Sequence, residues 1–458
     1  MDYTTKITQY LEANLSTFTG DLLEWLKIPS ISTLPEHKND VHRAALWIQN
    51  KLLHTGFKQP EIIETDGHPL VYAHWRVDPA QPTLLIYGHY DVQPADPLEL
   101  WKNPPFDPVI KDGNIYARGA SDDKGQIMLV MAALKAWVAI AGQPPINIKV
   151  LLEGEEEAGG SSIAAYVENN EETLAADGLL ICDTHMPSSN QPSIITGLRG
   201  IVYTELKING AKTDLHSGSY GGVAPNPIQA LCLMISQLKT EDGKIQIPEL
   251  QEAIPTPTPI EKKFYQDDPL KIEQALCSEM GVSKLVGESN FPPLERLGAR
   301  PTFEVHGIAG GFTAEGAKTV IPAEATAKIS LRIPPSFSPN EVFGWLQKSV
   351  KRLTPEGYNV QLTNIHAGSG VDVNMDNRFF QEASASLEAI YSKPPVLLKE
   401  GGSIPIAALF DQKLHIPVVL MGFALPDDNI HAPNEKFNLK QFFLGMRTVA
   451  DYLGRLKI

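Results

Sequence analysis

The apolar positions near the start of the chain recur at helical intervals. The members of this pattern are Ile7, Leu11, Phe18, Leu22, Leu26, Val41, Ala44, Trp47 and Ile48. Residues three and four positions apart share one face of a helix. The pattern therefore predicts that two amphipathic helices open the chain.

Four later stretches are apolar without clean alternation, which is typical of strands buried on both faces of a sheet. They are Leu84–Tyr87, Ile148–Leu152, Leu179–Cys182 and Pro417–Met421. A strong helical segment, Lys124–Ala141, lies between the first two. A strand, a helix and a strand in this order form a β-α-β unit, which requires a parallel pairing. We therefore expect an α/β fold.

The pattern changes from about Gly200 onward. Ile201–Ile208 and Ala327–Ile333 alternate apolar and polar residues, which predicts antiparallel strands with one face in water. Pro227–Leu238 has the spacing of a helix. Because the buried-strand pattern returns only later, we expect an α+β domain of residues 200–368 inserted into an α/β domain of residues 1–199 and 369–458.

The composition agrees with a folded protein of two domains. The chain has 458 residues, 43% of them hydrophobic, and a formal charge of -15 from 39 basic and 54 acidic residues. This balance argues against a nucleic-acid partner, since phosphate binding needs clustered Lys and Arg. Three scattered cysteines argue against a disulfide framework or a Cys-based zinc site.

The chain is expected to be cytoplasmic and to have no membrane partner. Its first residues, MDYTTKITQYLEANL, lack the pattern of a signal peptide. The most apolar stretch, Ile127–Ile140, is shorter than a membrane span and carries Lys135.

Metal-type ligands follow all four predicted buried strands. His89 and Asp91 follow the first, Glu153–Glu157 the second and Asp183 the third, and His431 comes a short loop after the fourth. Folds of this kind bind small molecules and ions at the carboxyl ends of the strands. We therefore expect these side chains to meet at one edge of the sheet.

Two acidic motifs add chemistry to this edge. In RGASDDKG (Arg118–Gly125), a carboxylate in the turn could bridge two cations, and the pattern leaves Asp122 and Asp123 both open. In EGEEEAGG, adjacent carboxylates would repel one another without cations. One Glu could bind a metal while its neighbour takes a proton from water, as Glu155 with Glu156 or Glu156 with Glu157.

Two His and three carboxylates, with one Glu to spare, match a two-metal site with nitrogen and oxygen ligands. Each acidic motif taken alone also has an explanation without metal. The Asp pair could mark a helix N-terminus, and the Glu run could be a solvated loop. The first alternative does not explain the glycine-rich turn before the Asp pair, and the second does not explain why the Glu run directly follows a buried strand.

Several motifs carry a family resemblance. They are GHYDVQP, ARGASDDKG, EGEEEAGG, DLHSGSYGG, GAKTVIP, EGGSIP and HAPNE. Because these motifs occur in this order, the chain resembles the M20 metallopeptidases over nearly its whole length. Within that family it resembles the carnosinase-like (cytosolic non-specific dipeptidase-like) subgroup. The resemblance implies a mixed, mostly parallel sheet with helices on both faces, and a lid and dimerisation role for the inserted domain.

The resemblance also assigns roles to the matching residues. Two zinc ions per subunit, or manganese, are expected on the ligands His89, Asp122, Glu157, Asp183 and His431. His89 and Asp183 would hold one ion, Glu157 and His431 the other, and Asp122 would bridge them. Asp91 would orient His89, Glu156 would be the general base, and Glu155 would be left in solvent. The peptide bond after Asp122 is expected to be cis.

In the inserted domain, the resemblance implies substrate contacts and a homodimer. His216 would reach the active site of the other subunit and stabilise the oxyanion. Arg332 would bind the terminal carboxylate of the substrate, with help from Thr319, His366 and Ser403.

The expected function is hydrolysis of the amide bond of dipeptides, or other small peptides with a free C-terminal carboxylate, by a hydroxide bridging two metals. The alternative enzyme is an N-acyl-amino-acid deacylase with the same metal residues. The alternative from another class is a catalytically silent scaffold protein.

Overall fold

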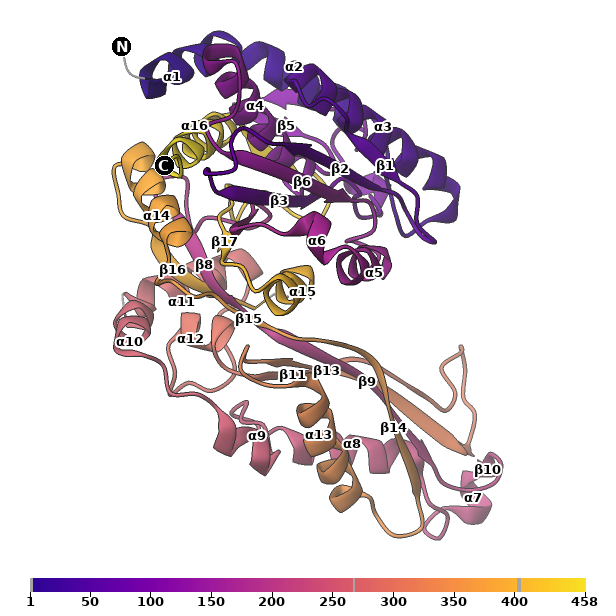
Figure 1. The fold of residues 1–458 in the computed structure, drawn as a ribbon. Helices are drawn as coiled ribbons and strands as arrows, with labels where there is room; N and C mark the ends of the chain where they lie inside the picture. The colour runs from indigo at the N-terminus through magenta and orange to yellow at the C-terminus, as the bar shows by residue number, and fades with distance from the viewer. Residues whose placement is uncertain (1–2, 267, 402–404) are drawn as a thin grey trace. The chain divides into compact units, whose positions relative to one another are not determined.

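The computed structural model describes residues 3–266, 268–401 and 405–458 (Figure 1). The chain divides into two compact units. The first comprises Met1–Thr196, Val373–Leu397 and Leu409–Ile458, and the second comprises Gly197–Asp372 and Leu398–Ala408.

The first unit is built on a mixed sheet. Its strands are β1 (Glu61–Ile63), β2 (Leu70–Trp75), β3 (Thr83–His89), β6 (Asn147–Glu153), β7 (Gly178–Ile181), β8 (Ser193–Leu198) and β17 (Val418–Leu420). The order across the sheet is β1-β2-β6-β3-β7-β17-β8. Strand β3 runs parallel to β6 and β7, and β17 runs parallel to β7. The pairs β1/β2, β2/β6 and β17/β8 are antiparallel.

The sheet continues where β8 enters the second unit. There β15 (Val371–Asp372) pairs with the end of β8, and β16 (Val396–Glu400) also pairs with β8. The four buried strands at the centre coincide with the four apolar stretches of the sequence. The predicted α/β fold with a mixed sheet is therefore confirmed.

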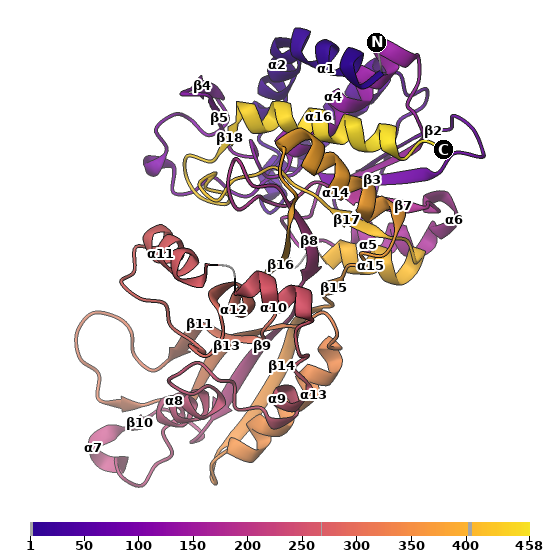
Figure 2. The ribbon, with the colours of Figure 1, turned by 90° about the vertical axis from the view of Figure 1, so that its left-hand side faces the viewer.

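Helices lie on both faces of this sheet (Figures 1 and 2). On one face, a side chain at Gly88 of β3 would meet Ile127 of α4 (Lys124–Ala141), and one at Gly178 of β7 would meet Phe379 of α14 (Arg378–Tyr391). The C-terminal helix α16 (Leu439–Arg455) packs against α4 and α14. On the opposite face, the ring of Tyr87 packs edge-on against Phe410 of α15 (Pro405–Leu414). The short helices α5 (Ser162–Asn169) and α6 (Glu171–Leu174) also lie on this side.

The N-terminal region forms three helices, so the prediction of two was wrong. They are α1 (Tyr3–Ala13), α2 (Leu15–Leu26) and α3 (Lys38–Thr55), the last preceded by the 3-10 turn η1 (Pro35–His37). The break falls at Asn14, whose side-chain amide donates to the carbonyl of Tyr10 at 2.8 Å. The backbone N-H of Asn14 donates to the same carbonyl at 3.1 Å, so the side-chain bond adds to the helical contact there. Apolar periodicity does not reveal such local side-chain contacts.

Helix α4 is the one helix of the described residues that is long and apolar enough to cross a membrane. However, 72% of it is buried inside the structure. Its apolar residues face the sheet and the neighbouring helices, so the protein core accounts for its composition.

A small sheet beside the main one joins distant parts of the chain. It contains β4 (Val109–Lys111), β5 (Asn114–Tyr116) and β18 (Lys436–Asn438), in the order β18-β5-β4. The pairing of β18 with β5 brings the chain before α16 beside the chain before α4. A 3-10 turn, η2 (Leu98–Leu100), precedes β4.

The second unit has its own core. An antiparallel sheet in the order β11-β13-β9-β14 consists of β9 (Gly200–Asn209), β11 (Thr302–Gly310), β13 (Glu324–Ile333) and β14 (Asn359–Gly368). One face buries alternate residues such as Leu206, Ile329 and Leu331 with side chains of α8 (Pro227–Leu238) and α13 (Pro339–Leu353). This confirms the antiparallel strands and the helix predicted from residue alternation.

The remaining elements of the second unit lie outside its four-stranded sheet. They are the pair β10 (Leu215–His216) and β12 (Val320–Ile321), and the helices α7 (Ser217–Tyr220), α9 (Pro248–Ala253), α10 (Pro259–Tyr265), α11 (Pro269–Met280) and α12 (Pro293–Gly298).

The start of α4 gives a stability prediction. A Cβ at Gly125 would lie 2.0 Å from the carbonyl oxygen of Ala120 and 2.7 Å from the ring of Phe437. Gly125→Ala should therefore lower the free energy of unfolding of the first unit by about 1–3 kcal/mol, the usual cost of overpacking. The control is Gly344→Ala in α13, where a Cβ meets nothing within 4 Å. It should be neutral or stabilising by up to about 1 kcal/mol. Urea denaturation measures both, and a Gly125→Ala protein as stable as the unmodified one would contradict this packing.

Candidate active site

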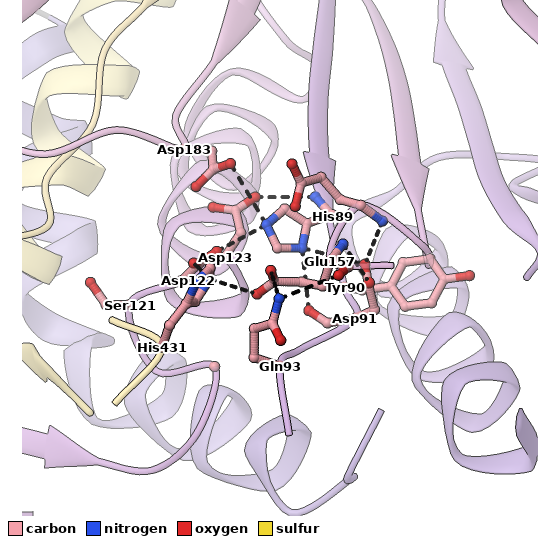
Figure 3. Close-up of polar contacts among 12 residues, drawn as sticks. His89, Tyr90, Asp91, Gln93, Ser121, Asp122, Asp123, Glu157, Asp183 and His431 are labelled. Carbon is pink, nitrogen blue, oxygen red and sulfur yellow. Dashed lines mark hydrogen bonds and ion pairs between the residues drawn. The ribbon is translucent and has the colours of Figure 1, made fainter. Parts of the chain in front are cut away.

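The side chains that follow the four central strands meet at one edge of the sheet (Figure 3). His89 is the last residue of β3 and lies beside Glu153, the last residue of the parallel strand β6. Asp183 follows β7, and His431 lies in the loop between β17 and β18. Parallel strands end at a common edge, so side chains far apart in sequence become neighbours.

Two groups of ligand-type side chains share one residue. Among the described residues, His89, Asp122 and Asp183 form one group, and Asp122, Glu157 and His431 form the other. The ligand atoms of each group lie within 4.8 Å of one another. Such groups of imidazole nitrogens and carboxylate oxygens suit zinc and similar divalent ions.

Asp122 presents one carboxylate oxygen to each group. Its Oδ1 lies 2.9 Å from Nε2 of His89, and its Oδ2 lies 2.9 Å from Nε2 of His431. Glu157 Oε1 lies 3.1 Å from the same nitrogen of His431, and Asp183 Oδ2 lies 3.6 Å from that of His89.

The buried Nε2 atom of His89 tests whether these residues fit a metal. Although it is close to Asp122, it has no hydrogen-bond partner of suitable geometry among the described residues. Buried ring nitrogens are normally satisfied. A nitrogen and two carboxylates that point toward a common position, without bonding to one another, fit a cation at that position.

Asp91 contacts both His89 and the backbone of Glu156 and Glu157. Its backbone oxygen lies 3.2 Å from Nδ1 of His89, and its carboxylate Oδ1 lies 3.4 Å from the same nitrogen. The carboxylate also accepts the backbone N-H groups of Glu156 at 3.2 Å and Glu157 at 3.0 Å. Asp91 is fully buried, so these contacts fix His89 and the Glu pair relative to each other.

The peptide bond between Asp122 and Asp123 is cis, as predicted. The carboxylate of Asp123 turns back and accepts the backbone N-H of His89 at 3.1 Å. Of the two Asp residues that the sequence pattern left open, Asp122 faces both histidines.

Burial and mutual repulsion shape the electrostatics of the carboxylates. Burial raises the pKa of Glu156 well above its usual value, and Asp183 and Glu157 raise it further against the effect of His89. Burial likewise raises the pKa of Glu157. The pKa of Asp122 is lowered instead, because its contacts with His431 and His89 outweigh burial.

The neighbouring carboxylates raise the pKa of both imidazoles. Contacts with Asp122 and Glu157 raise the pKa of His431 to about 10. Burial lowers the pKa of His89, but the nearby carboxylates of Asp122, Asp183 and Asp91 more than reverse this, and the pKa lies well above its usual value. The protonated imidazoles therefore offset part of the charge of the carboxylates.

One expectation about the acidic run was wrong. Glu155 is buried rather than solvated. Its Oε2 accepts the backbone N-H of His68 at 2.8 Å, and its Oε1 accepts that of Ser162 at 2.8 Å. His68 lies 87 positions away in the chain, so local sequence does not reveal this contact. Glu155 anchors the loop that carries Glu156 and Glu157.

Two further residues of the site were missed, although both stand in the quoted motifs. Gln93, in GHYDVQP, donates its amide to Oε2 of Glu157 at 2.8 Å. Glu435, in HAPNE, accepts the backbone N-H of Asp122 at 3.2 Å. The positions of Gln93 and Glu435 within the motifs could have marked them as site residues. Only the folded chain shows which residues they contact.

The other predicted site residues lie in the second unit. Nδ1 of His216 accepts the backbone N-H of Gly218 at 3.0 Å, and Nε2 lies 3.5 Å from the hydroxyl of Thr319. Arg332 is paired across the sheet with Ile201 of β9, and His366 with Tyr203 two residues along. Arg332 and His366 therefore lie on the same face of this sheet, on either side of β9. Ser403 lies outside the described residues.

Comparisons with known proteins agree with the motifs. Residues 85–455 match the family model described as Peptidase family M20/M25/M40. The chain is 31% identical to the Cys-Gly metallodipeptidase DUG1 of Saccharomyces cerevisiae, over 98% of this chain and 97% of that protein. It is 28% identical to the human Beta-Ala-His dipeptidase, over 98% of this chain and 91% of that protein.

A solved structure extends the comparison to the fold. The M20 family metallo-carboxypeptidase Sso-CP2 from Sulfolobus solfataricus superposes with a TM-score of 0.85 at 31% identity, covering 96% of this chain and 99% of that one. The chain therefore belongs to peptidase family M20, and the predictions of this family and of an M20-type metallopeptidase are confirmed.

The raised pKa of His431 predicts the pH dependence of metal binding. Because this pKa is about 10 without metal, the imidazole is protonated at pH 7 and must lose its proton to coordinate a cation. Between pH 6 and 8 the apparent affinity should rise about tenfold per pH unit for each proton released. Calorimetric titration with zinc in two buffers of different ionisation enthalpy measures the protons released.

The matched control for this titration is His42→Asn. The side chain of His42 is 42% exposed, and it lies 3.3 Å from the carboxylate of Glu64, outside the cluster. This variant should release as many protons as the unmodified protein. Zinc binding at pH 7 without proton release would refute the proposed coupling of His431 to Asp122 and Glu157.

Proposed function

We propose that the protein is a two-metal dipeptidase that hydrolyses the amide bond of dipeptides with a free C-terminal carboxylate. The observation that carries the proposal is Asp122, which offers one oxygen to the His89 group and the other to the His431 group. The names of the relatives, a Cys-Gly metallodipeptidase and a Beta-Ala-His dipeptidase, support the class of substrate.

His89 and Asp183 would hold one divalent ion, Glu157 and His431 the other, and Asp122 would bridge them. We propose zinc, with manganese as an ion that the same ligands accept. When bound, two such ions polarise the scissile carbonyl and lower the pKa of a water molecule.

Glu156 is the proposed general base and acid. Its pKa is raised by burial and by the neighbouring carboxylates, which suits a group that must both accept and return a proton. The carboxylate would accept the proton of the attacking water and then deliver it to the leaving amine. The contact between its backbone N-H and Asp91 would hold it in place during this exchange.

The second unit would supply the substrate contacts. Arg332, with Thr319 and His366, would bind the substrate carboxylate, and Ser403 is the fourth residue proposed from the motifs. His216 would stabilise the oxyanion in the active site of a partner subunit, which makes the proposed state a homodimer. Because its Nδ1 accepts a backbone N-H, the neutral ring carries its proton on Nε2, as this role requires. We also propose that the protein is cytoplasmic.

A substrate panel tests the proposed function. The panel contains Cys-Gly and β-Ala-His, a dipeptide amide without the terminal carboxylate, an N-acetyl amino acid and a tripeptide. Zinc-loaded protein should cleave the free dipeptides with the highest kcat/KM. Glu156→Gln should lower kcat by about 10²–10⁴-fold while retaining the metal, since only the proton-transfer group is lost.

Other outcomes decide between the alternatives. Preference for the N-acetyl amino acid would favour a deacylase. No hydrolysis of any member by protein that carries two metals would favour a scaffold role and contradict the proposal. A Glu156→Gln protein with full activity would contradict the assigned base.

A further inference from the structure

The loop that carries His431 and the turn that carries Asp122 are joined by a buried carboxylate that the chemistry above does not use. Glu435 is fully buried, and it lies four positions after His431. Its Oε1 accepts the backbone N-H groups of Ser121 at 2.9 Å and Asp122 at 3.2 Å. A carboxylate removed from water needs such donors, and here they come from the turn itself.

The second oxygen of Glu435 is also saturated. Oε2 accepts the backbone N-H of Gly119 at 2.8 Å and Nη1 of Arg118 at 2.9 Å. Arg118 is itself buried, and its Nη2 donates to the carbonyl of Pro94 at 3.0 Å. Three backbone amides and a guanidinium thus hold the Glu435 side chain in one orientation.

The backbone at Glu435 is tied to the same turn. Its carbonyl accepts the N-H of Ala117 at 3.1 Å, directly after the pairing of β18 with β5. The distance between the β5 segment and the loop is therefore set by a regular strand pair. Through its side chain, Glu435 also fixes the position of the turn relative to this strand pair.

The other end of the His431 loop is held by a second buried carboxylate. Asp428 Oδ2 accepts the hydroxyl of Ser121 at 3.1 Å and the backbone N-H of Leu425 at 2.7 Å. Oδ1 accepts Nζ of Lys436 at 3.0 Å, and the backbone N-H of Lys436 donates to the Asp428 carbonyl at 2.9 Å. Asp428 and Glu435 therefore bracket His431, and both contact the turn that ends in Asp122.

We infer that Glu435 is a positioning residue that sets the separation of His431 from Asp122 and so determines the affinity of the metal position formed by Asp122, Glu157 and His431. This inference rests on the proposed metal centre. The position formed by His89, Asp122 and Asp183 depends on it less, because His89 and Asp183 are held by strand ends that Glu435 does not contact.

Glu435→Gln is the direct test. The substitution keeps the size of the side chain, but it places an NH2 group against N-H donors and removes the charge opposite Arg118. Equilibrium dialysis against buffered free zinc should show a 10- to 100-fold weaker affinity for one of the two ions, with the other within about threefold of the unmodified protein. Anomalous diffraction from the dialysed variant should show the loss at the position beside His431.

A matched control separates positioning from general stability. Glu288 makes a bidentate, largely buried pair with Arg300 at 2.6 and 2.8 Å, and this pair belongs to the second unit. Glu288→Gln should lower the thermal midpoint of the metal-free protein without changing either zinc affinity. A purely structural role of Glu435 would give the same pattern.

The remaining outcomes are also decisive. If Glu435→Gln does not fold, Ser121→Ala, which removes only the hydroxyl bond to Asp428, should weaken the same ion by a smaller factor. Unchanged zinc affinities in the variant that folds, or equal losses at both positions, would overturn the inference. An unmodified protein that fails to bind two ions would instead overturn the proposed function.

Discussion

Four carboxylates meet at one edge of the central sheet, and their mutual repulsion is the constraint on which the site depends. They belong to Asp122, Glu156, Glu157 and Asp183, and burial adds to the cost of keeping them ionised. Two imidazoles lie beside these carboxylates, that of His89 at a strand end and that of His431 in a loop. A cluster of this charge is stable when protons or metal cations neutralise it. In the proposed function, binding of the two divalent ions would therefore displace protons from this cluster.

The fold meets this constraint by holding the cluster with rigid elements. Parallel strands bring His89 and Asp183 to a common edge, and the N-terminus of α4 follows the Asp122 turn directly. Around the ligands, buried acceptors such as Asp91 and Glu435 bind backbone amides of the ligand loops rather than the ligand side chains alone. Side chains supported in this way are held in position by the protein itself, which would favour metal binding without rearrangement.

Local patterns predicted the parts of the structure that local physics determines. The apolar runs became β3, β6, β7 and β17, and the helical segment became α4 with the predicted ends. The rule that ligands gather at strand ends also pointed to His89, Asp183 and His431. Apolar spacing could not show the break at Asn14, because the apolar positions continue at helical intervals on both sides of it. The buried carboxylate of Glu155 is bonded to His68, which only the folded chain brings near, as well as to the nearby Ser162.

The most direct test of the two-metal site is anomalous diffraction at the zinc edge from crystals of the zinc-loaded protein. Two peaks are expected, one among His89, Asp122 and Asp183 and the other among Asp122, Glu157 and His431, with one oxygen of Asp122 on each. A single peak, or two peaks away from Asp122, would contradict the bridging role on which the proposed function rests.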